Sequence, residues 1–416
     1  MRRFFVIEIA ISVIDKVVFT SLAFPIPVSP PIFILSNYGW MRIGFDAKRL
    51  FNNFTGLGNY SRFVMKALLE HYPDHHYTLY SPKVKDHKET HEFRTSPKLL
   101  VRTPPKWVKG SGFGSFWRSV NLGNIAFRDG MDLFHGLSNE LPVSKPKGLK
   151  TVVTVHDLIF IRYPKLYKKI DVNIYKRKIT NACKTADKII AISNQTSSDL
   201  QHYLKVPKER ITVIYQGCNT VFKTKASDEE IEKVRAKYNL PDQFVLTVGT
   251  LEPRKNSLLL LKAVAQTKER IPVVLIGKST SYQKQLNKLI EEENLNDRVH
   301  FIHHADFDDL PKIYQAAKIF VYPSRFEGFG IPIVEAIASG VPVIAARGSC
   351  LEEAGGPSSI YVDPDKDKEL ASAIDRLLND DSACKKMVEA SQSYIQQFEP
   401  KPIADKLMEV YKEMLA

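Results

Sequence analysis

The chain has 416 residues, of which 44% are hydrophobic and 25% are charged, and its four cysteines lie far apart. This length and composition exclude collagen, low-complexity scaffolds and wholesale disorder, and they allow two or three domains that fold without disulfides or a cysteine-based zinc site. The net charge of +13 is uneven, because residues 41–220 carry +16 and residues 221–416 carry −4. This asymmetry indicates two domains that face different partners.

The first forty residues begin like a signal peptide, with two arginines before an apolar run. Glu8, Asp15 and Lys16 interrupt the run, and four prolines follow, so no stretch of about 20 apolar residues remains to span a membrane. A compact strand pattern starts directly after Met41. We expect residues 1–40 to be an upstream extension outside the fold, with translation starting at Met41; a weak membrane anchor is the alternative.

From Met41 onward, short apolar runs alternate with longer helical patterns. Strands rich in Val and Ile, separated by helices, indicate parallel sheets that are covered on both faces. The predicted strands form two series, 42–45, 77–80, 131–135, 151–155, 188–192 and 211–215, then 244–248, 272–276, 299–302, 319–322 and 341–345. Helices are expected between them at 60–69, 194–204, 256–266, 282–292 and 310–317.

The polar segment 217–242 separates the two series of strands. We therefore predict an α/β chain with two doubly wound, Rossmann-like domains, the first at 41–220 and the second at 221–400. A last helix at 401–416 is expected to pack back over the hinge. Such sheets bind ligands at the carboxyl ends of their strands, so the expected site is a cleft between the two domains.

The segment from Pro323 to Glu335 is the most informative, because it follows a predicted strand and opens a helix. Gly328 and Gly330 let the backbone approach a ligand closely, and the exposed amides of a helix start bind anions. Glu327 lies in the loop and Glu335 about one turn inside the helix, and a carboxylate can accept hydrogen bonds from two vicinal hydroxyls. Two carboxylates beside an anion-binding helix start predict a site for a sugar nucleotide.

Three further segments give weaker signals. Arg254 and Lys255 lie in a loop after a strand and could hold a diphosphate in place of a metal cation, although a lone basic pair is more often a solvated loop. His156 also follows a strand, where it could bond a sugar hydroxyl or support departure of the leaving group; a structural histidine is the alternative. The sequence TGLGNY, with Gly56 and Gly58, lacks the third glycine of a dinucleotide fingerprint, and we interpret it as a loop that lets a substrate approach.

Together these segments resemble the retaining glycosyltransferases of family 4, and within them the mannosyltransferase-B-like branch. The resemblance runs from Met41 to about residue 400, and its most specific mark is the spacing of Glu327 and Glu335. It rests on the segments TGLGNYSR, FHGLSNELP, TVHDLIFIRYP, IIAISNQTSSDL, VGTLEPRKN, VLIGK, VYPSRFEGFGIPIVEA and YVDP. The resemblance implies the GT-B fold, in which two Rossmann-like domains face each other across a cleft.

The resemblance also implies an activity. The chain is expected to move a hexose, with mannose favoured, from a GDP- or UDP-linked nucleotide-diphospho-sugar to a lipid-linked or polysaccharide acceptor in cell-surface glycan biosynthesis. The transfer is expected to retain the anomeric configuration and to need no cofactor and no metal. Three alternatives stay open: a GT-B sugar-nucleotide epimerase, a glucan synthase, and a catalytically silent scaffold subunit.

Roles for single residues follow from the same resemblance. Glu327 and His156 would be catalytic, with Glu327 contacting the hydroxyls of the donor sugar and His156 touching the transferred sugar. Lys255 and Arg254 would bind the diphosphate, and Glu335 the ribose of the nucleotide. The remaining substrate-binding residues would line the same cleft: Gly56, Gly58, Phe329 and Gly330.

Two departures from the family pattern leave the identity of the donor open. Many relatives have an arginine where this chain has Thr250. Arg254 and Lys255 would therefore have to neutralise more of the negative charge of the diphosphate. A common S-L-P-E-V stretch that helps to contact the nucleotide appears here as C-L-E-E-A, from Cys350 to Ala354.

Two acidic pairs, Asp306 with Asp308 and Asp363 with Asp365, have the spacing of D-x-D metal motifs. We expect the first pair to be the N-cap and first-turn acids of a helix, and the second pair to lie in a turn.

Two basic segments, 101–120 and 165–184, interleave Lys and Arg with aromatic and aliphatic residues. They are either solvated helix faces over core aromatics or surfaces that dock on anionic lipid. No nucleic-acid recognition motif accompanies them, so nucleic acid is not an expected partner. We expect a cytoplasmic protein, with peripheral contact to the inner face of the cytoplasmic membrane as the further option.

Overall fold

The computed structural model describes residues 39–105, 114 and 117–416. The expectation for residues 1–40 therefore concerns residues that, apart from the last two, lie outside the described part of the chain. Residues 39–416 form one compact unit that is built on two parallel sheets.

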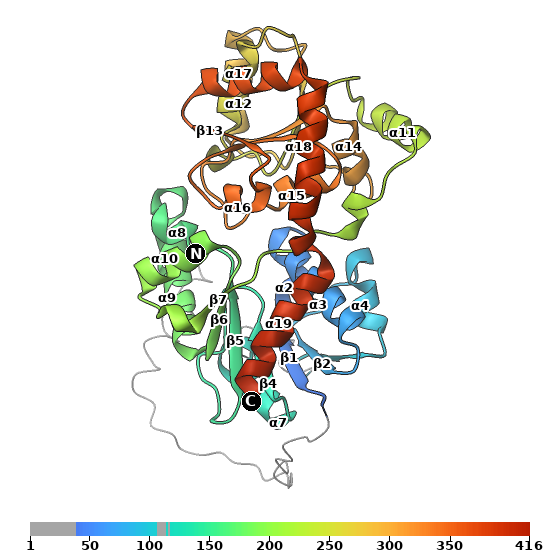
Figure 1. Ribbon diagram of the computed structural model, residues 1–416. Coiled ribbons are helices and arrows are strands. Elements are labelled where there is room, and N and C mark those ends of the chain that lie inside the picture. Colours follow the sequence, from blue (N-terminus) through green and yellow to red (C-terminus); the bar gives the residue numbers. More distant parts are fainter. Residues whose placement is uncertain (1–38, 106–113, 115–116) are drawn as a thin grey trace. The chain divides into compact units, whose positions relative to one another are not determined.

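The first sheet has seven strands in the order β3-β2-β1-β4-β5-β6-β7 (Figure 1), and every neighbouring pair is parallel. The strands are β1 (Arg42–Asp46), β2 (His76–Tyr80), β3 (Leu99–Arg102), β4 (Leu133–Gly136), β5 (Lys150–Val155), β6 (Lys188–Ala191) and β7 (Ile211–Val213). Six of them confirm the predicted series, with ends shifted by one or two residues. Strand β3 was not predicted; it is a short edge strand in which half-buried and exposed residues alternate.

The helices of the first sheet lie on both of its faces (Figure 1). They are α2 (Lys48–Asn52), α3 (Gly56–His71), α4 (His91–Thr95), α7 (Leu122–Arg128), α8 (Ile159–Arg162), α9 (Lys169–Thr185) and α10 (Asn194–Leu204). Ser193 begins α10 as an N-cap whose hydroxyl accepts a hydrogen bond from the Thr196 backbone N–H. We call this sheet and its helices the first lobe.

The second sheet has six parallel strands in the order β10-β9-β8-β11-β12-β13. They are β8 (Val245–Val248), β9 (Val273–Ile276), β10 (Val299–Ile302), β11 (Ile319–Tyr322), β12 (Val343–Ala346) and β13 (Ile360–Val362). The first five confirm the second predicted series, whereas the three-residue strand β13 was not predicted. We call this sheet and its helices the second lobe.

The helices of the second lobe follow the strands in alternation. They are α11 (Asp228–Tyr238), α12 (Ser257–Ala265), α13 (Gln283–Glu292), α14 (Leu310–Ala316), α15 (Ile331–Ala338), α16 (Leu351–Gly355) and α17 (Asp367–Leu378). Ser227 and Glu230 form a capping box at the start of α11, where each side chain accepts a hydrogen bond from the backbone N–H of the other. Alternating strands and helices, with the strand order of a Rossmann sheet in both lobes, confirm the predicted fold class.

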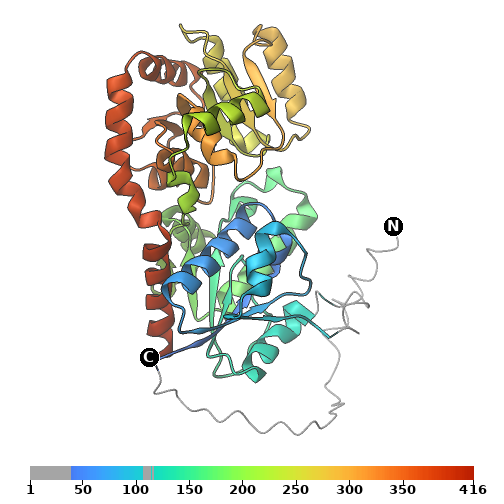
Figure 2. The ribbon, with the colours of Figure 1, turned by 90° about the vertical axis from the view of Figure 1, so that its right-hand side faces the viewer.

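Two consecutive helices at the end of the chain connect the lobes, and Figure 2 shows them along one side. Helix α18 (Asp381–Tyr394) packs on α15 and α17 of the second lobe, and a short 3₁₀ turn, Ile395–Phe398, leads into α19 (Pro400–Leu415). Helix α19 packs against α3 and buries one apolar face, with Leu407 and Tyr411, in the core of the first lobe. The buried His135 on β4 accepts or donates a hydrogen bond at 2.6 Å to the Tyr411 hydroxyl, which fixes this helix on the sheet.

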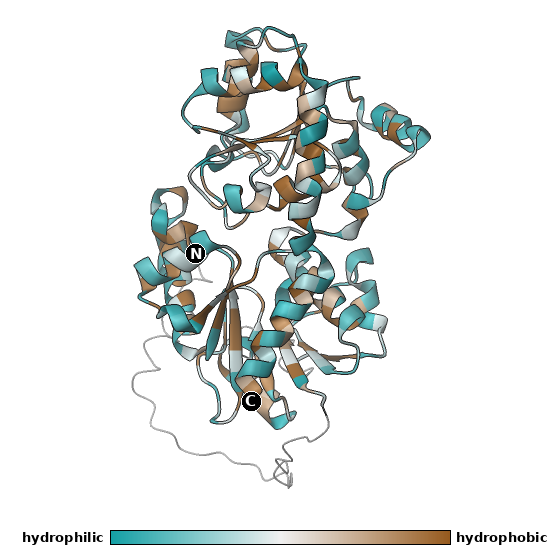
Figure 3. Cartoon of the chain, viewed as in Figure 1, coloured by the Kyte–Doolittle hydropathy of each residue, from teal (hydrophilic) through white to brown (hydrophobic). Residues whose placement is uncertain are grey.

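Apolar strands carry the core of each lobe, and Figure 3 shows them mainly in the hydrophobic colour. Strands β8, β9, β11 and β12 are buried along almost their whole length. Burial on both faces is what a parallel sheet covered by helices requires. The rigid strands therefore position the loops at their carboxyl ends, where the polar residues of the predicted site lie.

Candidate active site

The polar residues of the second lobe gather where its strand order reverses, between β8 and β11. The loop after β8 carries Arg254 and Lys255, and the loop after β11 carries Glu327. The backbone N–H of Arg325 donates to the Arg254 carbonyl at 2.9 Å, so the two loops are tied together. A doubly wound sheet opens a crevice at this point because the crossover helices leave in opposite directions.

Glu327 is the centre of a cluster of ionic and hydrogen-bonding groups. Its Oε1 accepts hydrogen bonds from Lys255 Nζ at 2.6 Å, from the Ser324 hydroxyl at 2.6 Å and from the Tyr322 hydroxyl at 3.2 Å. Its Oε2 lies 2.6 Å from Arg254 Nη1, and among the described residues only this group reaches Oε2. Oε2 therefore keeps lone-pair capacity to accept a further hydrogen bond.

The two cations keep Glu327 ionised. Burial alone would raise the pKa of this carboxyl, but Lys255 and Arg254 outweigh burial and lower the pKa to about 2. Burial also lowers the pKa of Lys255, and Glu327 opposes that change. A carboxylate with such a low pKa is a weak base, so the geometry suits Glu327 for orienting a donor sugar and stabilising positive charge.

The two basic residues have different freedom to bind an anion. The Arg254 guanidinium already donates to Glu327, to Glu252 at 2.6 Å and to the Phe326 carbonyl at 2.7 Å. Lys255 Nζ donates to Glu327 and to the Tyr322 hydroxyl at 2.6 Å, which leaves one of its three N–H groups for a ligand. Lys255 is therefore the better placed cation for a phosphate, and Arg254 holds the Glu327 loop.

Helix α15 begins beside this cluster at Gly330, which has a φ of +125°. A side chain there would be strained by this φ, and its Cβ would come within 2.9 Å of the Leu351 side chain on α16. Glycine thus lets the chain turn from the Glu327 loop directly into the helix. The first amides of α15, with the positive end of the helix dipole, add to the anion-binding potential of the loop.

Glu335 lies within α15, and its environment differs from that of Glu327. Its carboxylate accepts a hydrogen bond from the Tyr314 hydroxyl at 3.0 Å, and no cation of the described chain pairs with it. Burial raises the pKa of Glu335 to about 7, and the bond from Tyr314 only partly opposes this rise. The predicted pair of glutamates therefore has one member that is ionised and one that is poised near neutrality.

His156 directly follows β5 of the first lobe and lies against the Glu327 loop. A Cβ on Gly328 would come within 2.3 Å of the His156 carbonyl oxygen, so only glycine fits between the two lobes here. The buried ring donates from Nε2 to the Leu137 carbonyl at 2.9 Å, and Nδ1 accepts from Gln216 at 3.1 Å. Burial lowers the pKa of His156 to about 4, so the ring is neutral near pH 7.

These contacts bring His156 to the site but occupy both of its ring nitrogens. To bond a sugar hydroxyl, the ring must release Gln216 or the Leu137 carbonyl. Its predicted catalytic role therefore stays a prediction, and it needs a rearrangement when a substrate binds.

Two residues near the site were not identified from the sequence. Asp157 follows His156 and is close enough to interact electrostatically with Arg254 and Glu327; burial raises its pKa. Glu353, on α16, crosses to the first lobe and accepts hydrogen bonds from the Asn194 and Gln195 backbone N–H groups at 2.7 and 3.0 Å. The sequence shows Asp157 beside His156 and Glu353 in the C-L-E-E-A segment, but only the folded chain shows which groups these two acids face.

The structure also shows the surroundings of the other predicted substrate-binding residues. The Phe329 side chain stacks on Tyr215 and packs against Phe398 in the core, so a contact of Phe329 with a substrate would have to come from its backbone. Gly58, in the first turn of α3, packs against the Asn53 carbonyl, whereas Gly56 has open space around it. Their predicted contacts with a substrate stay predictions.

The structure corrects the expectation for the acids before α14. Helix α14 begins at Leu310 with Asp309 as its N-cap residue, so Asp306 and Asp308 are neither its N-cap nor its first-turn acids. Asp306 instead forms an ion pair with Lys237 at 2.7 Å. Asp363 lies in the turn after β13, where its carboxylate accepts from the Asp365 backbone N–H at 2.9 Å.

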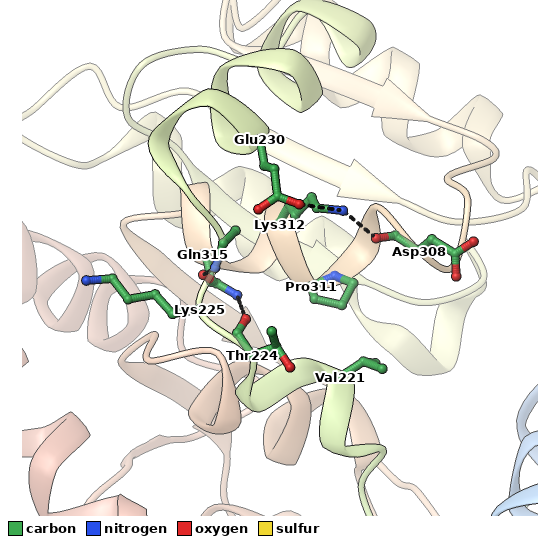
Figure 4. Close-up of a pocket in the computed structure, with 9 residues that line it drawn as sticks. Val221, Thr224, Lys225, Glu230, Asp308, Pro311, Lys312 and Gln315 are labelled. Carbon is green, nitrogen blue, oxygen red and sulfur yellow. Dashed lines mark hydrogen bonds and ion pairs between the residues drawn. The ribbon is translucent and has the colours of Figure 1, made fainter.

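A separate cavity of about 250 Å³ lies beside α11 and α14 and shares no lining residue with the Glu327 cluster (Figure 4). Its polar side chains bind each other and nearby backbone: Lys312 lies 3.8 Å from Glu230, and Gln315 donates to the Thr224 carbonyl at 2.9 Å. We assign no ligand to this cavity. Over residues 39–105, 114 and 117–416, no group of three or more His, Cys, Asp or Glu side chains is arranged to hold a metal, and no helix is long and apolar enough to span a bilayer.

Comparison with known proteins identifies the family. A model of Glycosyltransferase Family 4 matches residues 54–222, and a model of Glycosyl transferases group 1 matches residues 228–394. O-antigen chain mannosyltransferase B of Escherichia coli is 31% identical over 263 residues, which make up 62% of this chain and 68% of that protein. The serotype-specific mannosyltransferase WbdA of Escherichia coli is 30% identical over 64% of this chain, but the match spans only 34% of WbdA.

Solved structures agree on the fold. The structure of Anabaena HepE in complex with UDP and glucose superposes with a TM-score of 0.69 at 20% identity, over 90% of this chain and 100% of that one. This fold and the matched families define a GT-B glycosyltransferase. The chain belongs to the family 4 glycosyltransferases, and it is a transferase enzyme.

Proposed function

We propose that the chain transfers a hexose, with mannose favoured, from a nucleotide-diphospho-sugar to a lipid-linked or polysaccharide acceptor, with retention of the anomeric configuration. The observation that carries this proposal is the Lys255–Glu327–Arg254 cluster at the strand-order reversal of the second lobe. Support for mannose and for a glycan acceptor comes from the relatives, two of which are mannosyltransferases that are 30–31% identical to this chain.

The residues suggest how the donor would be held. Its diphosphate would lie at the free N–H of Lys255 and the first amides of α15, which neutralise negative charge as the leaving group departs. A hydroxyl of the sugar would donate to Glu327 Oε2, and hydroxyls of the ribose would reach Glu335. Since the cations are supplied by the chain, we propose that transfer needs neither a metal nor a cofactor.

The chemistry of retention follows from the same arrangement. Glu327 is held at Oε1 by three donors and has a pKa of about 2, so it is a poor nucleophile. The departing diphosphate would instead accept the proton of the acceptor hydroxyl on the same face of the sugar. The bond between the anomeric carbon and the diphosphate oxygen breaks as the bond to the acceptor oxygen forms, and the products are the glycoside and the protonated nucleoside diphosphate.

The donor is identified by melting the protein with a panel of GDP- and UDP-linked hexoses. A ligand that binds only the folded chain stabilises it by about 2.7 kcal/mol at 100 times its Kd. We expect GDP-mannose to raise the melting temperature most. Product analysis with and without an oligosaccharide acceptor then separates transfer from epimerisation, because an epimerase needs no acceptor. A protein that binds no nucleotide-sugar would be the silent scaffold, and the proposed function would be wrong.

A further inference from the structure

The start of α9 and the turn before it expose an unusual number of apolar side chains. Five of the eight large hydrophobic residues that are exposed in the described chain lie in this one segment. They are Tyr163, Leu166, Ile170, Ile174 and Tyr175, and Ile170 is 70% exposed. In the 17-residue helix α9 only Ile179, Ala182 and Cys183 are buried, so most of its first half is exposed. Exposed apolar residues that gather in one place mark an interaction surface.

The same segment is strongly basic. Residues 163–178 contain six Lys or Arg residues and a single acid, Asp171. All six are exposed, and Lys178 forms an ion pair with Glu140 at 3.2 Å. The other five are Lys165, Lys168, Lys169, Lys176 and Arg177. We call these five cations and the five exposed apolar residues the α9 face. In the other basic segment expected from the sequence, the two described cations are paired: Arg118 is buried between Asp46 and Glu140, and Arg102 pairs with Asp129. Its remaining cations lie outside the described residues.

Helical spacing places the two kinds of side chain together. Ile170 and Ile174 are four residues apart, and Arg177 follows one turn later, so these side chains lie along one side of α9. A helix with exposed apolar residues flanked by Lys and Arg has the pattern of an element that lies in the interface of a bilayer, with its apolar side chains among the acyl chains and its cations at the headgroups.

The α9 face also borders the proposed active site. The Tyr163 ring contacts the Phe326 ring edge to face at 5.5 Å, and the Arg162 guanidinium lies 4.5 Å from the centre of the same ring. Phe326 directly precedes Glu327. A surface docked through the α9 face would therefore lie next to the loop that is proposed to hold the donor sugar.

We infer that the α9 face docks the enzyme on a bilayer that carries anionic phospholipid headgroups. This inference rests on the proposed function for its purpose, because docking would bring the site to an acceptor that is anchored in lipid. Charge complementarity favours such a membrane over a second copy of this chain, since two identical faces with this charge repel each other. Exposed aliphatic residues between the cations favour a bilayer over nucleic acid, which offers no apolar layer for Ile170 and Ile174.

Vesicle co-sedimentation tests the inference with the full chain. Vesicles of phosphatidylcholine with phosphatidylglycerol are compared with vesicles of phosphatidylcholine alone. We expect the wild type to bind the anionic vesicles only. The Lys168→Gln/Lys169→Gln variant should bind them about 30-fold more weakly. The Ile170→Ser/Ile174→Ser variant should also bind more weakly than the wild type, and this difference should remain at high salt because it comes from lost apolar contact. The matched control is Lys385→Gln/Lys386→Gln, an exposed lysine pair on α18 that should bind like the wild type.

Three results would overturn the inference. One is equal binding of the Ile170→Ser/Ile174→Ser variant and the wild type to anionic vesicles. Another is a wild-type dimer in light scattering that this variant loses, which would assign the face to a second copy. The third is a duplex oligonucleotide that binds the face more tightly than the vesicles do.

Transfer to a short, water-soluble acceptor separates this inference from the proposed function. The α9-face variants should keep wild-type turnover with that acceptor and an unchanged melting temperature, because the substituted side chains are exposed. Loss of vesicle binding with intact transfer supports docking, whereas vesicle binding without any transfer by the wild type leaves docking in place and rejects the proposed function.

Discussion

Glu335→Gln should remove a pH-dependent part of the stability of this enzyme. Burial within the second lobe raises the pKa of Glu335 to about 7 from an ordinary value of 4.5, and the hydrogen bond from Tyr314 offsets only part of this rise. Between these two pH values the folded chain holds a proton that the unfolded chain has released. The free energy of unfolding therefore falls as the pH rises through this window.

The size of the effect follows from the two pKa values. At 1.36 kcal/mol for each pH unit, the interval from 4.5 to about 7 corresponds to a loss of about 3 kcal/mol, which is complete above pH 7. The amide in the Glu335→Gln variant is neutral at every pH and can keep the hydrogen bond from Tyr314. The variant should therefore resemble the wild type near pH 5 and be the more stable protein near pH 8.

Urea unfolding at pH 5, 6, 7 and 8 measures this difference. The control is Glu291→Gln, which changes an exposed glutamate of α13. We expect the wild-type free energy of unfolding to drop by about 3 kcal/mol relative to Glu335→Gln across the series, and the control to follow the wild type. Parallel curves for the wild type and Glu335→Gln would show that Glu335 is ionised throughout, and the reasoning from burial would be wrong.

Three further predictions concern the contacts around the site. Gly328→Ala places a Cβ 2.3 Å from the His156 carbonyl oxygen, so it should destabilise the chain by about 1–3 kcal/mol and lower turnover; wild-type melting and turnover would contradict this packing. Glu353→Ala removes the carboxylate that caps α10 from the other lobe and should cost about 1 kcal/mol and increase the radius of gyration in X-ray scattering; an unchanged radius would argue against this contact in solution. The ionised Glu327 contributes stability that is present above pH 4.5 and is lost as the pH falls towards 2. Glu327→Gln should therefore destabilise the chain by about 3–5 kcal/mol near pH 7 and make the free energy of unfolding depend less on pH in acid. A variant whose stability falls in acid as steeply as that of the wild type would refute the ionised state of Glu327.

Much of the fold could be predicted because its strands are apolar runs buried on both faces. The runs at β8, β9 and β11 have few polar residues and clear loops after them, so their boundaries were predicted to within one residue. Strands β3 and β13, edge strands of four and three residues, were not predicted, although the equally short edge strands β7 and β10 were. What selects them as strands is pairing with β2 and β12, which is a tertiary effect.

The position of the site in the second lobe was also predictable, since Lys255 and Glu327 follow strands that become neighbours at the reversal point. The direction of single side chains was not. The Phe329 side chain packs in the core against Tyr215, from the loop after β7, and against Phe398, from the turn before α19. Both residues are far from Phe329 in the sequence. His156 donates to the Leu137 carbonyl and accepts from Gln216, and these bonds also depend on segments that meet only in the folded chain.

The most direct measurement of the central claim is the turnover of sugar transfer by the wild type and by Lys255→Met in the presence of a metal chelator. We expect the wild type to keep its full rate in chelator and Lys255→Met to lose about 100-fold or more, because the variant lacks the cation that faces the diphosphate. Lys262→Met, which changes an exposed lysine of α12, should transfer like the wild type. A wild-type rate that collapses in chelator, or a Lys255→Met variant that transfers as fast as Lys262→Met, would contradict the account.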